Sequence, residues 1–118
     1  MTTLIKFCRI LLLLSVLAAP ATAQDATGRI EGTLRDPQGA LVPNANIVLT
    51  HLATGGEKSV NSGNTGSFNF VLLPIGQYRL VVEAANFARY VREPLTLNVN
   101  DVLRLTIDLK IGTSQEVV

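Results

Sequence analysis

The chain has 118 residues, with ten basic and nine acidic side chains and a formal net charge of +1. Charges of both signs are scattered along it, so it offers neither nucleic acid nor an anionic membrane a basic surface. Cys8 is the single cysteine, so no disulfide can form within the chain. This length suits one small domain with a single core.

The first 23 residues have the three parts of a secretory signal peptide. Lys6 and Arg9 make the start of the chain positive, an apolar run of about ten residues follows, and an A-x-A motif ends at Ala23. We therefore predict cleavage between Ala23 and Gln24. The mature protein would be secreted.

An uncleaved membrane anchor is the alternative interpretation of this segment. Such an anchor needs about 18 to 20 apolar residues, and Pro20 interrupts the run before that length is reached. Without the signal peptide, about 95 of the 118 residues remain, with eight basic side chains, nine acidic ones and no cysteine. The mature form is not expected to span the membrane, and its stability must come from packing.

Beyond the signal peptide, apolar and polar residues alternate with period two, which is typical of an antiparallel all-β domain. In chain order, the expected strands cover residues 29–35, 45–49, 57–61, 68–72, 77–83, 87–92, 95–99 and 103–110. The residues predicted to point inward are Ile30, Leu34, Ile47, Leu49, Phe68, Phe70, Tyr78, Leu80, Leu105 and Ile107. About seven short strands on a chain of this size favour a single sandwich of two sheets.

Turn residues separate the expected strands. Residues 36–39 read D-P-Q-G, with proline and glycine at the positions that a β-turn favours. Gly66 and Gly76 lie where the chain reverses and where a side chain would resist a positive φ. We place the sandwich domain at residues 24–110 and expect residues 111–118 to be a carboxyl-terminal tail or linker.

Two stretches of the domain carry closely spaced motifs. Residues 28–49 read GRIEGTLRDPQGALVPNANIVL, and residues 66–82 contain G-x-F-x-F followed by L-P-x-G-x-Y-x-L-x-V. An aromatic residue, Phe87, comes next. In this combined spacing the chain resembles the carboxypeptidase regulatory-like domain family from about Thr27 to Leu109. Asn86 stands where the family usually has glycine, and asparagine also accepts the left-handed backbone conformation.

The resemblance implies a prealbumin-like β-sandwich, which agrees with the alternation. Members of this family often form the amino-terminal extension of TonB-dependent outer-membrane receptors, between a signal peptide and a plug. The resemblance therefore implies a structural or protein-interaction role, with a cell-envelope protein or a following receptor domain as the partner. It also implies a bacterial protein that is secreted across the inner membrane and is periplasmic or associated with the outer membrane. Residues 111–118 would begin the connection to the plug. The sequence leaves open whether the chain is a free-standing module or a piece of a longer receptor.

Few residues of the chain could carry catalysis. His51 is the single histidine, and at a strand end it is expected to be solvated or locally hydrogen-bonded. The glycine runs at 54–56 and 63–66 lack the Lys-Ser/Thr ending of a phosphate loop. Residues 61–67 lack the clustered carboxylates that calcium requires. We expect no catalytic, cofactor-binding or metal-binding residue, and the protein is not predicted to be an enzyme.

A carbohydrate-binding module of the same general fold is the alternative function. Such modules use exposed aromatic rings as platforms for sugars, and this chain has no tryptophan. Most of the other aromatic residues fall on the inward register. Tyr90 and Phe87 remain as candidate ligand contacts, although Phe87 also fits an anchor at the edge of the core, which is the favoured interpretation.

Overall fold

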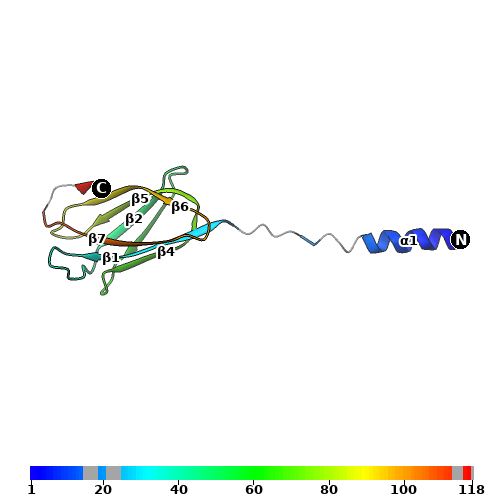
Figure 1. Cartoon of the computed structure of the whole chain (residues 1–118), viewed down its shortest axis with the longest axis horizontal. Coiled ribbons are helices and arrows are strands. Elements are labelled where there is room, and N and C mark those ends of the chain that lie inside the picture. Colours follow the sequence, from blue (N-terminus) through cyan, green and yellow to red (C-terminus); the bar gives the residue numbers. More distant parts are fainter. Residues whose placement is uncertain (15–18, 21–24, 113–115, 118) are drawn as a thin grey trace.

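The computed structural model describes residues 1–14, 19–20, 25–112 and 116–117. Figure 1 shows a helix set apart from a sandwich of strands. The described elements are α1 (Thr2–Leu14), β1 (Thr27–Arg35), β2 (Asn46–His51), β3 (Glu57–Asn61), β4 (Ser67–Pro74), β5 (Gly76–Glu83), β6 (Tyr90–Leu97), β7 (Val102–Asp108) and β8 (Glu116–Val117).

Helix α1 lies within the predicted signal peptide. Leucine and other straight-chain residues favour the helix, and the side chains of Leu4, Ile5 and Phe7 are exposed. No helix among the described residues has the length and apolar character that crossing a membrane requires. The predicted cleavage point between Ala23 and Gln24 lies outside the described residues.

The strands form two facing sheets, one in the order β4-β1-β7 and the other in the order β3-β2-β5-β6-β8. Most neighbours are antiparallel, but β1 pairs in parallel with β7, and β6 pairs in parallel with β8. The predicted all-β sandwich of about seven strands is confirmed, with the two-residue β8 in addition. Alternation did not indicate the parallel pairs because the side-chain period is two in either direction.

Strand β6 combines two segments that the sequence separated. Tyr78 pairs with Leu95 and Leu80 with Arg92, so the register against β5 shifts between these pairs. Glu93 and Pro94 both lie in the resulting bulge, and the bulge interrupts the alternation. The prediction of separate strands at 87–92 and 95–99 is therefore wrong.

The carboxyl-terminal segment also pairs with the sandwich. Phe87 forms an isolated bridge with Ile111, and β8 pairs with Tyr90 and Val91 of β6. The sequence predicts only a tail at 111–118, because this short polar segment has no apolar alternation. Its role as a linker stays a prediction.

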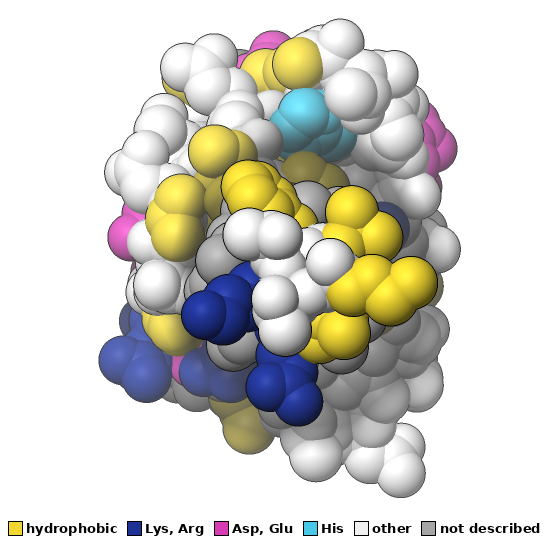
Figure 2. Space-filling model, turned by 90° about the vertical axis from the view of Figure 1, so that its right-hand side faces the viewer, with side chains coloured by type: hydrophobic (Ala, Val, Ile, Leu, Met, Phe, Trp, Pro, Cys, Tyr) yellow, Lys and Arg dark blue, Asp and Glu magenta, His cyan; other side chains and the backbone are white. Residues whose placement is uncertain are grey.

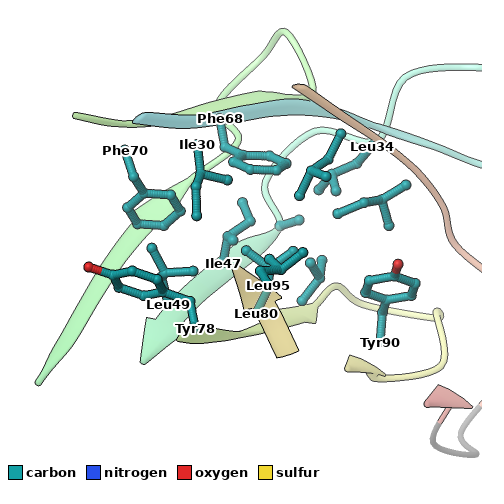
Figure 3. Close-up of a cluster of buried hydrophobic side chains, with 14 of the residues drawn as sticks. Ile30, Leu34, Ile47, Leu49, Phe68, Phe70, Tyr78, Leu80, Tyr90 and Leu95 are labelled. Atoms are coloured by element: carbon teal, nitrogen blue, oxygen red, sulfur yellow. The ribbon is translucent and has the colours of Figure 1, made fainter. Parts of the chain in front are cut away.

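Side chains from both sheets fill the space between them (Figure 3). All ten of the predicted core residues are buried, but Leu72, which the same alternation predicts to point inward, is 73% exposed because the register of β4 shifts there. The burial of the ten confirms their register, because a slip by one residue would turn a strand's apolar side chains outward. Gly32 continues the inner face of β1, where an added Cβ would lie 2.7 Å from the Phe68 ring and 2.4 Å from the Leu105 carbonyl oxygen.

One buried polar side chain joins the loop before β2 to the turn after β3. Ser62 is 2% exposed, its hydroxyl donates to the carbonyl of Val42, and it accepts a hydrogen bond from the N–H of Ala45. A buried hydroxyl is tolerated because both contacts are made. Ser62 gives no signal in the sequence, because a serine between Asn and Gly has the composition of any exposed turn.

We predict that Phe70→Ala lowers the free energy of unfolding by about 3 to 5 kcal/mol, because the side chain is 3% exposed and its loss leaves a cavity. The neighbouring Val71 is 50% exposed, so Val71→Ala should change stability by only about 0.5 kcal/mol. Denaturant unfolding of the two variants measures both values. Equal losses would show that the inward register is wrong.

Candidate interaction surface

Tyr90 does not form an exposed aromatic platform. Its side chain is 7% exposed and belongs to the core, because β6 begins opposite Val82 and shares the inner face of β5 (Figure 3). Phe87 is partly buried and packs against the same cluster. Tyr90 is therefore not an exposed platform, Phe87 packs as an anchor at the core edge, and a ligand contact by either ring stays a prediction. Neither ring therefore gives the carbohydrate-binding alternative an exposed platform for a sugar.

His51 ties two loops together at one end of the sandwich. Its Nδ1 lies 2.9 Å from the Thr54 hydroxyl, and its Nε2 lies 3.1 Å from the Ile75 carbonyl oxygen, to which an N–H can donate. The ring also meets Tyr78 edge to face, with centroids 4.9 Å apart. The predicted local hydrogen bonding is confirmed. Both ring nitrogens serve the loops, which leaves neither placed to move a substrate proton.

Charged side chains pair across the outer face of the three-stranded sheet. Glu31 accepts a hydrogen bond from Arg104 at 2.9 Å and lies 3.5 Å from Arg29. Arg35 pairs with Asp108 at 3.1 Å. Because these side chains are partly solvated, each pair stabilises the fold by about 1 kcal/mol or less. Within the described ranges, no three His, Cys, Asp or Glu side chains are grouped so that they could hold a metal ion.

Two strands at the margins of the larger sheet discourage further pairing. On β3, Lys58 lies opposite Leu49 and therefore on the inner register, where a charge opposes the addition of a strand. On β6, Pro94 has no N–H to donate, the bulge bends the strand, and β8 pairs with Tyr90 and Val91. These features resemble the devices by which natural sheets avoid edge-to-edge aggregation.

The two edges of the smaller sheet differ from each other. The register of β4 shifts against β1 near Leu72, which has a φ of 52° and a side chain that is 73% exposed. By contrast, β7 pairs with β1 over seven consecutive residues, from Val102 to Asp108, without a shift. It contains no proline. Among the described strands, β7 is therefore the regular edge that can accept another strand.

Exposed apolar side chains gather at the end of the sandwich where β1 begins. The ends of β4 and β6 lie there too, because Thr27 pairs with Pro74 and Gly76 with Leu97. Figure 2 faces this end and shows hydrophobic side chains near the histidine. The exposed residues that lie in these loops and strand ends are Leu52, Val71, Leu72, Ile75, Val99 and Val102. They form an apolar end surface that adjoins the start of β7.

The sequence from residue 29 to residue 110 matches the carboxypeptidase regulatory-like domain. The chain belongs to this family. The match covers more than half of the 118 residues and ends shortly after the last residue of β7. The family resemblance that the motifs indicated is confirmed.

One curated relative of this carboxypeptidase regulatory-like domain is the TonB-dependent transporter Oar of Myxococcus xanthus. The two sequences are 33% identical over 91 residues, a region that covers 75% of this chain and 8% of the transporter. The chain therefore spans a small fraction of the length of the curated relative that it matches.

Solved structures with the same fold come from proteins of different kinds. A streptococcal ancillary pilin matches with a TM-score of 0.57 and 13% identity, over 75% of this chain and 34% of the pilin. The major pilin subunit BcpA of Bacillus cereus matches with a TM-score of 0.57 and 20% identity, over 74% of this chain and 31% of BcpA. Hydroxyquinol 1,2-dioxygenase of Pseudomonas putida matches with a TM-score of 0.61 and 9% identity, over 78% of this chain and 59% of the dioxygenase. At these identities the likeness shows the fold alone.

We predict that Gly76→Ala destabilises the domain by about 1 to 3 kcal/mol more than Gly112→Ala, because it forces an overpacked contact. The two glycines have nearly equal φ angles, 140° and 138°, so the backbone strain is matched. An added Cβ at Gly76 would lie 2.6 Å from Nε2 of His51, whereas nothing lies within 4 Å at Gly112. Thermal unfolding measures the difference, which should shrink in a His51→Ala background. Equal losses would contradict the contact.

We predict that the stability difference between the wild type and Tyr78→Phe narrows above about pH 10. The Tyr78 hydroxyl donates to the Pro74 carbonyl, and burial raises the pKa of Tyr78 above its ordinary value of 10.0. Stability from this group is therefore complete below pH 10.0 and is lost as the pH rises through the folded pKa. At neutral pH the variant should lose about 0.5 to 1.5 kcal/mol. A constant difference in urea unfolding across this range would refute the assignment.

Proposed function

We propose that this domain is a non-catalytic protein-interaction module of a bacterial cell envelope. The observation that carries the proposal is its 33% identity to a segment that makes up 8% of a TonB-dependent transporter. A segment that is so small a part of a transporter suits an accessory role better than transport itself. We place the domain ahead of the plug of such a receptor, in the periplasm or at the outer membrane.

The polar groups of the domain support a non-catalytic role. His51 is occupied by two loop contacts, and Arg35 and Arg104 of the smaller sheet face carboxylates on the neighbouring strand. General acid–base catalysis needs a titratable pair held in a cleft with separated pKa values. Glu31 and Arg104 instead pair with each other at an open hollow of the outer sheet face, where they suit recognition of another surface.

A sheet edge gives the module a way to bind protein. An added strand would hydrogen-bond to backbone groups that β7 directs away from β1, while alternate side chains select the partner. The partner would be a cell-envelope protein or the domain that follows in a receptor. Export by a signal peptide ending at Ala23 would deliver the module to that compartment.

Hydrogen exchange in the presence of envelope extract tests this function. The full chain, diluted until it is monomeric in buffer, is labelled in buffer, in envelope extract and in cytoplasmic extract of equal protein concentration, and amide protection is compared. We expect the amides of the edge strand β7 to gain protection in envelope extract alone, while the protection of core amides of β5 stays unchanged. Equal protection in all three samples would contradict binding to an envelope protein, and protection in both extracts would indicate nonspecific contact.

A further inference from the structure

The open side of β7 can be assigned residue by residue. The Asp101 carbonyl accepts a hydrogen bond from the N–H of Arg29, and the N–H of Leu109 donates to the Arg35 carbonyl, both at 2.8 Å. Backbone groups alternate in direction along a strand, so the odd-numbered residues of β7 point toward β1. The even-numbered residues direct their N–H and C=O groups outward, and their side chains lie on the outer face of the sheet. They are Val102, Arg104, Thr106 and Asp108.

The outward side chains of β7 complement those of a second β7 strand that runs antiparallel to it. If Thr106 lies opposite Thr106 of a second copy, then Arg104 lies opposite Asp108 of that copy. Asp108 lies in turn opposite its Arg104. Opposite charges and threonine pairs are favourable cross-strand neighbours. Both charged side chains have room for a second contact, because Arg104 is 75% exposed and Asp108 is 68% exposed.

The inner face of β7 fits the same register. Leu105 would lie opposite Ile107 of the second copy, and Leu103 opposite Leu109. In the single chain, Leu105, Ile107 and Leu109 are buried, and Leu103 packs at the margin of the core. The reversed strand therefore sets apolar residues against apolar ones on one face and opposite charges on the other.

We propose that two copies of the chain associate by antiparallel pairing of their β7 strands about a twofold axis at Thr106. This inference rests on the proposed function as an interaction module, and it names the edge and the partner. The three-stranded sheets would join in the order β4-β1-β7-β7-β1-β4. On the outer face, charges would alternate from Glu31 to Arg104 of one copy and then to Asp108 and Arg35 of the other.

The other edges do not offer this match. The outward residues of β4 in its regular part, Ser67 and Asn69, are uncharged, and its register shifts beyond Phe70. Lys58 opposes pairing at β3, and Pro94 with the bulge opposes it at β6. Charge complementarity within the described strands therefore favours β7.

Removing one edge-facing donor tests the pairing. The N–H of Thr106 points away from β1, so Thr106→Pro removes a hydrogen bond to the second copy and none within the chain. Asn69→Pro is the matched control, since its N–H faces the open side of β4. The full chain and both variants are compared by sedimentation equilibrium over a concentration series, with circular dichroism to verify the fold. Helix α1 is the same in all three samples, so any association through it would raise their masses equally.

We expect the wild type and Asn69→Pro to sediment as dimers at the higher concentrations. Thr106→Pro should show a twofold lower mass under the same conditions. A wild type that stays monomeric overturns the proposal, and so does a folded Thr106→Pro variant that still dimerises. A monomeric wild type that nevertheless gains protection in envelope extract would leave the proposed interaction function standing, so the two failures are distinguishable.

A cross-link tests the register and does not require a proline to be tolerated. Directly opposed residues of a hydrogen-bonded pair have Cα atoms about 5.5 Å apart, within the range of about 4.4 to 6.8 Å that a disulfide spans. In a Cys8→Ser background, Thr106→Cys should therefore form disulfide-linked dimers under mild oxidation, whereas the control Asn69→Cys should not. Equal yields from the two, or none from Thr106→Cys, would overturn the proposal.

Discussion

The absence of a side chain at Gly32 allows the smaller sheet to assemble. β1 must lie between β4 and β7, and at this position the Phe68 ring and the Leu105 carbonyl oxygen occupy the space that a Cβ would take. With β1 in the middle, the first and last long strands of the domain run in the same direction. This places β7 at an edge and orders the charged rows of Glu31, Arg104 and Asp108 on the outer face.

Much of the fold follows from local sequence patterns. Ile30, Leu80 and Ile107 are buried as their alternation predicts, and the turn at residues 36–39 is closed by Asp36, whose carboxylate accepts N–H groups from Gln38 and Ala40. Alternation reports which face a residue occupies but not which strand lies beside it. The parallel partner of β1, the bulge at Pro94 and the pairing of β8 depend on contacts distant in sequence, so the pattern did not reveal them.

The candidate site was less predictable than the core. The local bonding of His51 followed from its place at a strand end. The burial of Tyr90 did not, because it depends on where β6 begins relative to β5 and on the position of Val82. An open edge is harder still to find, since its identity requires knowledge of the strand order. The only local signal for β7 is its unbroken alternation of charged or polar residues with leucine and isoleucine, which a strand in the middle of a sheet could also show.

The parallel pairing of β1 and β7 also determines how the domain would respond to tension. The chain enters the sandwich at the start of β1 and leaves at the opposite end, beyond β7 (Figure 1). If the two ends were pulled apart, the short β8 pairing would peel away first, since it joins only two residues of β6. The force would then act along β1 and β7 in opposite directions, and it would shear their seven residue pairs together. Because these pairs would have to break together, the pairing of β1 with β7 would resist a pull applied between the two ends while the core stays folded.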